Sequence, residues 1–374
     1  MKLLFDARFW RKSTGGIGRY TRELLHELLK LGTDDTFHVL LTPADEAEFD
    51  VRDKRVTAHI VPIAHYSLAE QRKLPGLIRT IAPDLTHYLN FNQPLWGGGK
   101  RVTTIHDLTI RYFPTGAQQR SLIRRLGFRL AMQRAASSDA VVAISRATKI
   151  DVIKELKPDP AKVHVIYEGA DDRFTPRPKL ELDAFRKRVG RAKPYILFVN
   201  QWRPHKGLPE LVAAFDLLKT KYQLPHELVI AGKPNPDFPD IPAAIEASAH
   251  RSEIVLPGFI TDDDLPLYYA AAETLAFPSY YEGFGLGLLE AMSAGLPVVC
   301  TDTSSLPEVA GRAGHYVKAG DVTDLARGLN EVLTDPELAA RLSKESLEQA
   351  KRFSWAKMAK ETYAVYQSVL GEKK

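Results

Sequence analysis

The stretch SYYEGFGLGLLEAMSAGLPVVC, residues 279–300, places two glutamates, Glu282 and Glu290, on either side of a glycine-rich turn. The apolar residues 286–293 are expected to form a helix, and residues 297–301 a buried strand. A glycine turn that leads into a helix N-terminus presents backbone N–H groups to an anion or to a sugar. The two carboxylates therefore allow two interpretations, a general acid/base pair or a grip on a polyhydroxylated ligand. Because the spacing crosses a loop and about one turn of helix, separate contacts on one ligand are favoured.

Composition indicates a globular protein of more than one domain. The chain has 374 residues, of which 44% are hydrophobic and 26% charged, and this length favours two or three domains. Its single cysteine, Cys300, excludes an intramolecular disulfide framework and fits a reducing compartment. A run of about 18 uncharged apolar residues is missing, and the N-terminal residues favour a first strand over a signal peptide. We therefore expect a cytoplasmic protein, and the net charge of +5 suits anionic partners.

Short apolar runs alternate with helical segments in both halves of the chain, which predicts two open α/β domains with parallel sheets covered on both faces. In the N-terminal half, strands are expected at 2–5, 37–41, 101–105, 140–144 and 163–166, and helices at 19–31 and 145–156. In the C-terminal half, strands are expected at 195–199, 227–231, 254–256, 274–277 and 297–301, and helices at 208–219, 262–272 and 286–293.

The expected domain boundary falls in a polar, proline-containing stretch that begins at Asp171. We expect an N-terminal domain over 1–172, a C-terminal domain over 173–354, and a final helix, 355–374, that packs back on the first domain. Ligands of such sheets bind at the carboxyl ends of the strands, so a cleft between the domains is the expected site.

A second glycine turn, STGGIGRYTREL, follows the first expected strand and precedes a helix expected to start near Arg19. A dinucleotide fingerprint is a poor match, because its third glycine would fall at Thr21 and no acidic residue follows the second strand. Two interpretations remain: ligand contact through the backbone at Gly16, or a tight strand-to-helix turn.

Several segments, in order along nearly the whole chain, resemble the retaining glycosyltransferases of family 4 (group 1). The resemblance implies the GT-B fold, in which two Rossmann-like, doubly wound parallel-sheet domains face a central cleft, with the acceptor on the first domain and the nucleotide-sugar donor on the second. The matching segments are GGIGRYTREL, TTIHDLTIRYFP, AISRATKIDVIKEL, VIYEGADDRF, VNQWRPHKGLPELVAAF, LVIAGKP, IVLPGFITDDDLPLYYAAAETLAFPS, YYEGFGLGLLEAMSAGLPVVCTDTSSLPEVAG and FSWAKMAKETYAVY.

The reaction implied by this resemblance develops negative charge on a diphosphate leaving group and positive charge on the sugar. The resemblance makes Lys206, in RPHKG, the cation for the phosphates; the alternative is an ordinary surface lysine. Many relatives add an arginine near the end of the preceding strand, but Asn200 or Gln201 stands there in this chain. Arg203 is the proposed substitute.

Glu282 is expected, by resemblance, to bind the hydroxyls of the donor sugar, and Glu290 those of the ribose. The alternative is that both glutamates merely stabilise the N-terminal part of a helix. Backbone groups expected to hold the donor, including its base near Pro257, belong to Gly258, Phe259, Ile260, Gly283, Phe284, Gly285 and Leu286.

His106, in TIHDL, lies near the sugar in relatives, where it either bonds a hydroxyl or steadies developing charge; the alternative is a strand-end histidine or an acceptor contact. Asp107 is expected to orient the imidazole or to bind the acceptor. The resemblance implies front-face attack, in which the leaving phosphate takes the proton, so no general base is required. Metal and cofactor are not implied, because the acidic run 262–264 is expected to cap a helix and carry solvated charge.

Residues 108–138 contain arginine but no acidic residue, which gives a basic amphipathic helix. A membrane surface or lipid-diphosphate acceptor is one interpretation, and a solvated helix packed on the sheet by Leu122, Leu126 and Leu130 is the other. The arginines are Arg111, Arg120, Arg124, Arg125, Arg129 and Arg134, of which Arg124, Arg125 and Arg129 are the candidate acceptor or membrane contacts.

The resemblance thus implies a retaining hexosyltransferase that acts in the assembly of surface polysaccharide, with a glycan or polyprenyl-diphosphate-linked acceptor. It is expected to be cytoplasmic and peripheral on the inner face of the membrane, and nucleic acid is not an expected partner. GDP-mannose is the favoured donor, on similarity to O-antigen and capsule mannosyltransferases. The alternatives are a UDP-hexose or UDP-N-acetylhexosamine donor, a non-catalytic nucleotide-sugar binding protein, and a dinucleotide dehydrogenase.

Overall fold

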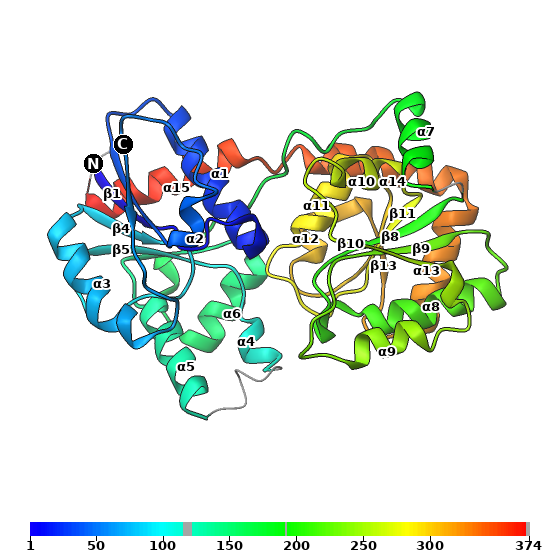
Figure 1. Cartoon of the computed structure of the whole chain (residues 1–374), viewed down its shortest axis with the longest axis horizontal. Coiled ribbons are helices and arrows are strands. Elements are labelled where there is room, and N and C mark those ends of the chain that lie inside the picture. The colour runs from blue at the N-terminus through cyan, green and yellow to red at the C-terminus, as the bar shows by residue number, and fades with distance from the viewer. Residues whose placement is uncertain (115–121, 191–192, 372–374) are drawn as a thin grey trace. The chain divides into compact units, whose positions relative to one another are not determined.

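The computed structural model describes residues 1–114, 122–190 and 193–371, and the chain folds into two compact units. Unit 1 comprises Met1–Gly169 with Ser354–Lys374, and unit 2 comprises Ala170–Phe353. Each unit is a parallel sheet with helices on both faces (Figure 1).

The sheet of unit 1 has seven strands in the order β3-β2-β1-β4-β5-β6-β7, and every pair is parallel. β1 lies centrally, with Leu3 paired to Phe37 on one side and to Leu85 on the other. The strand order reverses between β1 and β4, which makes the carboxyl ends of these strands the place where an open sheet binds ligands. The strands are β1 (Lys2–Asp6), β2 (Thr36–Leu41), β3 (Val56–Ile60), β4 (Leu85–Tyr88), β5 (Lys100–Ile105), β6 (Ala140–Ala143) and β7 (Val163–Val165).

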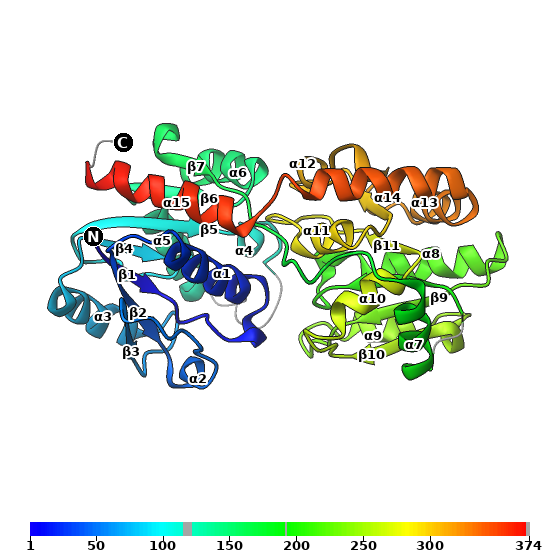
Figure 2. The same cartoon turned by 90° about the horizontal axis from the view of Figure 1, so that it is seen from above.

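Successive residues of a strand point to opposite faces of the sheet, so helices of unit 1 pack against both faces. Leu4 packs with Leu74 and Ile81 of α3, whereas the ring of Phe5 lies 6.2 Å from that of Tyr366 in α15. α1 and α15 run side by side over the sheet (Figure 2). The helices are α1 (Gly16–Lys30), α2 (Pro43–Glu46), α3 (Leu68–Ile81), α4 (Thr109–Tyr112), α5 (Leu122–Ala136), α6 (Arg146–Leu156) and α15 (Trp355–Leu370).

The sheet of unit 2 has six parallel strands in the order β10-β9-β8-β11-β12-β13, with the reversal between β8 and β11. The strands are β8 (Tyr195–Val199), β9 (Glu227–Ala231), β10 (Ile254–Gly258), β11 (Thr274–Phe277), β12 (Val298–Thr301) and β13 (Gly314–Val317). The helices are α7 (Lys179–Arg188), α8 (Leu208–Thr220), α9 (Asp240–Glu246), α10 (Leu265–Ala271), α11 (Leu286–Ser293), α12 (Leu306–Ala310), α13 (Val322–Thr334) and α14 (Pro336–Ala350).

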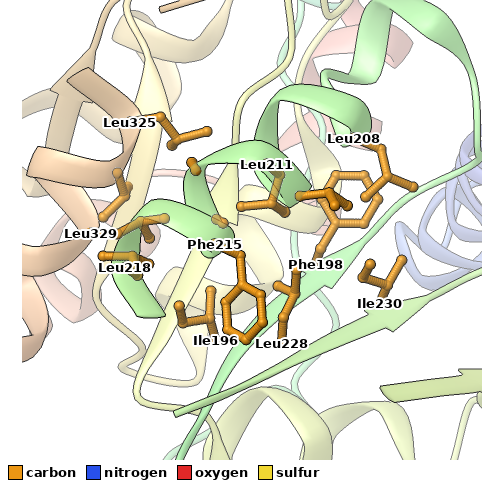
Figure 3. Close-up of a cluster of buried hydrophobic side chains, with 14 of the residues drawn as sticks. Ile196, Phe198, Leu208, Leu211, Phe215, Leu218, Leu228, Ile230, Leu325 and Leu329 are labelled. Carbon is orange, nitrogen blue, oxygen red and sulfur yellow. The ribbon is translucent and has the colours of Figure 1, made fainter. Parts of the chain in front are cut away.

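The core of unit 2 is built between its sheet and several of its helices, α8 and α13 among them. Phe215 of α8 packs over Ile196 and Leu228 of the sheet, and Leu325 and Leu329 of α13 close the cluster from the side (Figure 3). These side chains are buried almost completely, and burial of this size is the main stabilising contribution to such a unit.

The predicted fold class is confirmed, and so are most of the predicted elements. The sequence interpretation missed β3, β4 and β13. Two helix starts were wrong: α1 begins at Gly16 rather than near Arg19, and α10 at Leu265 rather than 262. The stretch taken as a linker contains α7, and its Phe174 is buried against Tyr269. Within 1–114, 122–190 and 193–371, no helix is both long and apolar enough to cross a membrane.

Candidate functional site

The reversal point of the unit 2 sheet gathers the residues expected to bind a donor. Asn200 follows β8 directly, and Lys206 lies in the 3₁₀ turn Pro204–Lys206 that comes next. Ser279 and Glu282 lie in the loop after β11, the neighbouring strand. Since parallel strands end at the same edge, these two loops meet there.

Gly207 allows the two loops to approach. A Cβ at this position would lie 2.3 Å from the backbone oxygen of Pro278, and the residue has a φ of +67°, so only glycine fits without strain. The backbone N–H of Tyr280 donates to the carbonyl of His205 at 2.8 Å, which fixes the same approach. Lys206 is thereby held beside the β11 loop.

Lys206 and Glu282 form an ion pair. Lys206 Nζ donates to Glu282 Oε2 at 2.7 Å, and the two side chains are 12% and 10% exposed. The other carboxylate oxygen, Oε1, accepts from the hydroxyl of Ser279 at 2.7 Å and from Asn200 Nδ2 at 3.4 Å. The site therefore holds an ammonium and a carboxylate in a mostly buried position, each able to exchange its partner for a charged or hydroxylated ligand.

A second segment, directly after β12, supports this loop. Ser304 Oγ accepts from the backbone N–H of Glu282 at 2.9 Å, and the Ser305 hydroxyl bonds the carbonyls of Glu282 and Phe284 at 3.1 and 2.9 Å. Ser279, Ser304 and Ser305 were not identified from sequence. For Ser304 and Ser305, the signal that could have found them is the hydroxyl-rich run TDTSS at the end of a strand adjacent to β11.

The glycine turn leads into α11 as expected. Gly285 is the residue before the helix, with a φ of +99°, and a Cβ there would lie 3.0 Å from Leu306. Glu290 lies on α11, 4% exposed, and Oε2 accepts from the hydroxyl of Tyr269 at 3.3 Å. Gly283 and Phe284 are buried, whereas Leu286 is half-buried. The two glutamates thus belong to different elements, a loop and a helix.

The segment expected to contact the nucleotide base of the donor lies at the end of β10. Gly258 accepts a bond from Gly232 N at 3.0 Å, and Ile260 is half-buried. The Phe259 ring is 63% exposed, and Lys233 Nζ lies 5.3 Å from its centre. An exposed aromatic face beside a cation suits a planar ring that carries a diphosphate.

Arg203, the proposed second cation, is exposed at the residue before the 3₁₀ turn. Among the residues that the structure describes, it makes no hydrogen bond or ion pair with Glu282, whereas Asn200 does bond that carboxylate. Burial, reinforced by the charges of Lys206 and Arg203, lowers the pKa of the adjacent His205 to about 3, so this histidine is neutral. The positive charge of the turn therefore comes from Lys206 and Arg203.

Two of the three glycines of the first turn in unit 1, Gly16 and Gly18, differ in their surroundings. A Cβ at Gly18 would lie 2.3 Å from Thr14 Oγ1 and 2.5 Å from the Arg11 carbonyl, so this glycine is required by packing. A Cβ at Gly16, the exposed first residue of α1, would meet nothing within 4 Å. Packing explains Gly18, while Gly16 remains a candidate for close approach of a ligand.

His106 lies directly after β5, 6% exposed. Nε2 lies 2.9 Å from the carbonyl of Leu89, and Nδ1 lies 3.6 Å from Oε1 of Glu168. Asp107 instead accepts from the backbone N–H of Thr109 at 2.7 Å, which begins α4. The carboxylate beside the imidazole is thus Glu168, which was not identified from sequence.

A buried polar chain lies on the same strands. The hydroxyl of Thr104 bonds Tyr20 and His87, each at 2.9 Å, and His87 Nδ1 lies 2.6 Å from the hydroxyl of Tyr366. Burial lowers the pKa of His87 to about 3, with a smaller contribution from the charge of His106. His87 is therefore a neutral link between the sheet and α15.

The basic helix α5 exposes Leu126 and Leu130. Leu126 and Leu130 are 56% and 46% exposed, beside the exposed Arg125 and Arg129, and the buried contacts of α5 come from Ala131, Met132, Ala135 and Ala136. The interpretation that leucines pack this helix on the sheet is therefore wrong for Leu126 and Leu130. Arg120 and the side chains of Leu122 and Arg124 lie outside the described residues. Arg111 pairs with Glu155, and Arg134 donates to the Gly97 carbonyl.

Acidic residues 262–264 precede α10, and Asp264 occupies its N-cap position without a side-chain hydrogen bond to the helix. The Asp264 carboxylate bonds Arg188 instead of the helix N-terminus, while the Asp263 side chain is 98% exposed. In the part of the chain that the structure describes, no three His, Cys, Asp or Glu side chains gather in a way that could hold a metal ion.

The chain matches two models of known protein families. Residues 181–349 match the model of "Glycosyl transferases group 1", and residues 14–174 match that of "Glycosyltransferase Family 4". The chain is 28% identical to O-antigen chain mannosyltransferase B of Escherichia coli, over 98% of this chain and 99% of that protein.

Solved structures share the fold. Sucrose-phosphate synthase from Thermosynechococcus elongatus superimposes with a TM-score of 0.78 at 21% identity, covering 100% of this chain and 99% of that one. Anabaena Alr3699/HepE in complex with UDP and glucose superimposes with a TM-score of 0.77 at 20% identity, covering 98% and 100%. The chain belongs to the family 4 glycosyltransferases and is an enzyme of the GT-B fold that uses a nucleotide-sugar donor.

Proposed function

We propose that the enzyme transfers mannose, with retention, from GDP-mannose to a glycan or polyprenyl-diphosphate-linked acceptor in surface polysaccharide biosynthesis. The observation that carries the proposal is the similarity to O-antigen chain mannosyltransferase B, which spans both proteins almost completely. Family membership alone leaves the sugar open, so the choice of mannose rests on this relative.

In the proposed donor complex, unit 2 binds each part of GDP-mannose separately. Lys206 leaves Glu282 to contact the diphosphate, and Glu282 then accepts from hydroxyls of the mannose. The turn 283–286 offers backbone N–H groups to the diphosphate and the sugar, and Glu290 binds the ribose. Gly258, Phe259 and Ile260 receive the base, and Gly16 of unit 1 offers its backbone N–H to the phosphates.

In the proposed reaction, the acceptor hydroxyl attacks the anomeric carbon on the face of the leaving group. The bond from this carbon to the phosphate oxygen breaks, the bond to the acceptor oxygen forms, and the acceptor proton passes to the leaving phosphate. Lys206 stabilises the negative charge on the diphosphate, with Arg203 as a second cation. His106 is the group of unit 1 that acts beside the sugar, without a metal or cofactor.

The acceptor and membrane contacts are assigned to unit 1. Exposed Leu126 and Leu130 beside Arg125 and Arg129 give α5 the composition of a helix that lies on an anionic lipid surface. Together with Asp107 and Arg124, this helix is the proposed contact for a lipid-linked acceptor at the inner face of the membrane.

A UDP-hexose or UDP-N-acetylhexosamine donor is the second candidate, supported by the fold shared with Alr3699/HepE, whose structure contains UDP and glucose. Lys206, Glu282 and Glu290 are assigned to parts that both donors share. The base is assigned mainly to backbone groups, so these contacts by themselves do not choose between guanine and uracil, and the preference for GDP rests on the mannosyltransferase relative.

A thermal-shift panel tests the donor. We expect GDP and GDP-mannose to raise the melting temperature more than UDP, UDP-glucose and UDP-N-acetylglucosamine at equal concentration, because a ligand that binds the folded state stabilises it by mass action. A larger shift with the uridine nucleotides would assign the second candidate, and no shift with either set would contradict the proposed site.

A further inference from the structure

Both ring nitrogens of His106 face groups of the protein. The Leu89 carbonyl can only accept a hydrogen bond, so Nε2, at 2.9 Å, carries a proton and donates it. Nδ1 faces Glu168 Oε1 at 3.6 Å, and the two side chains are 7% and 4% exposed. The ring of Tyr20 stands edge-on at 4.9 Å and limits its rotation. The orientation of the imidazole is thus determined on three sides.

The backbone is held by contacts on both sides of Glu168 in the sequence. Ile166 N donates to the Ala143 carbonyl at 3.0 Å, which ties the preceding backbone to the sheet. A Cβ on Gly169 would lie 2.3 Å from the backbone nitrogen of Trp355, so this residue packs directly on the first turn of α15. Glu168 is therefore positioned by backbone contacts rather than by its own flexible side chain.

A carboxylate at Nδ1 matters for the charge near the sugar. A ring that carries protons on both nitrogens donates to Leu89 and directs its Nδ1–H toward Glu168, whose carboxylate offsets the positive charge. An uncompensated imidazolium would repel the positive charge that develops on the sugar. The neighbouring Tyr20, Thr104 and His87 are neutral, so Glu168 is the group among these that can supply the compensation.

We propose that Glu168 is a positioning residue, which fixes the ring of His106 and offsets its charge during glycosyl transfer. The expected change in kcat rests on the proposed function. The expected change in the His106 NMR signals rests on the ring geometry alone. It also assigns a role to the last residues of unit 1 before the chain enters unit 2 at Ala170.

The test compares Glu168→Gln, which keeps the shape and removes the charge, with Glu168→Ala and with a matched control, Glu181→Gln. Glu181 lies on α7 with its side chain 42% exposed. We expect Glu168→Gln to lower kcat roughly 10- to 100-fold with little change in donor KM, as for other groups that orient a reacting side chain. The control is expected to match the wild type. In a His106→Ala background, Glu168→Gln is expected to add little.

Histidine-selective ¹⁵N NMR gives the second readout. The His106 signals are assigned as those that disappear in His106→Ala, and we expect Glu168→Gln to change the Nδ1 signal far more than Glu181→Gln does. Unchanged kcat and unchanged His106 signals in Glu168→Gln would overturn the proposal, as would an equal kcat loss with and without His106. A wild type that turns over none of the donors would contradict the proposed function instead, and the NMR comparison would still decide the role of Glu168.

Discussion

The ammonium of Lys206 lies 2.7 Å from the carboxylate of Glu282, and this pair joins the loops that follow β8 and β11. The contact combines the two residues that the family resemblance assigns to different parts of the donor. Each residue satisfies the charge of the other in a mostly buried position. Donor binding is therefore expected to replace one ion pair with two sets of ligand contacts.

Removal of either partner is expected to abolish transfer while the fold remains intact. Loss of Lys206 removes charge stabilisation at the leaving group, which typically costs on the order of 10²–10³ in kcat. Glu282 retains its bonds to Ser279 and Asn200 in Lys206→Ala, so the native structure persists. Steady-state kinetics and circular dichroism of Lys206→Ala and Glu282→Ala check this expectation, with Lys187→Ala as a surface control. Full activity in both variants would contradict the assignment of Lys206 and Glu282 to the donor site.

Gly16 and Gly18 of the first turn are expected to respond differently to alanine. Gly18→Ala forces a Cβ into Thr14 and Arg11 and should destabilise unit 1 by about 1–3 kcal/mol. Gly16→Ala meets open space and should fold normally, but it should raise the donor KM about tenfold if the phosphates approach this backbone. Melting temperatures and donor titrations separate the two effects. A normal donor KM in a folded Gly16→Ala would leave this turn with a purely structural role.

The buried His87 predicts a loss of stability on acidification. Its pKa is about 3 in the folded protein and about 6.5 when unfolded, so between these values the unfolded state binds more protons. The contribution of His87 is fully present above pH 6.5 and is lost as the pH falls toward 3, with a slope of at most about 1.4 kcal/mol per pH unit. Denaturant unfolding between pH 7 and 5 measures this dependence of the free energy of unfolding on pH. We expect His87→Asn to be less stable at pH 7 and to show a shallower slope; an unchanged slope would contradict a neutral His87.

Vesicle binding tests the exposed face of α5. We expect co-sedimentation with vesicles that contain anionic phospholipid, and little with neutral vesicles, because basic residues near such a surface contribute about 1 kcal/mol each. Arg125→Gln/Arg129→Gln should weaken binding about tenfold or more. Arg341→Gln/Arg352→Gln removes the same charge from unit 2 and serves as the control. Equal weakening by both pairs would indicate a net-charge effect and not a contact through α5.

Much of the fold could be predicted because its central strands are continuous apolar runs between helical segments. The missed strands lack that signal. β3 is an edge strand with mostly exposed residues, β4 is buried but contains the polar Thr86 and His87, and β13 is a short edge strand that begins with glycine. Their strand character comes from pairing with neighbours, which a local pattern does not contain.

The donor residues could be assigned for a similar reason: they occur in short, ordered motifs. The residues that support these motifs through hydrogen bonds and ion pairs could not be assigned from sequence, because their contacts join distant parts of the chain. Ser304 supports a loop 22 residues earlier, and Glu168 lies beside a histidine that precedes it by 62 positions. Hydrogen bonds of this kind depend on which strands are adjacent, and the sheet order had first to be known.

Turnover of GDP-mannose tests the central claim most directly. Purified wild-type enzyme, supplied with GDP-mannose and a lipid-linked or glycan acceptor, is expected to release GDP and form an α-linked mannosyl product, as retention requires. Glu282→Ala should form none under the same conditions, and UDP-glucose and UDP-N-acetylglucosamine should support little or no release. Turnover of a uridine donor alone would contradict the proposed donor, and an inverted linkage would contradict the proposed reaction.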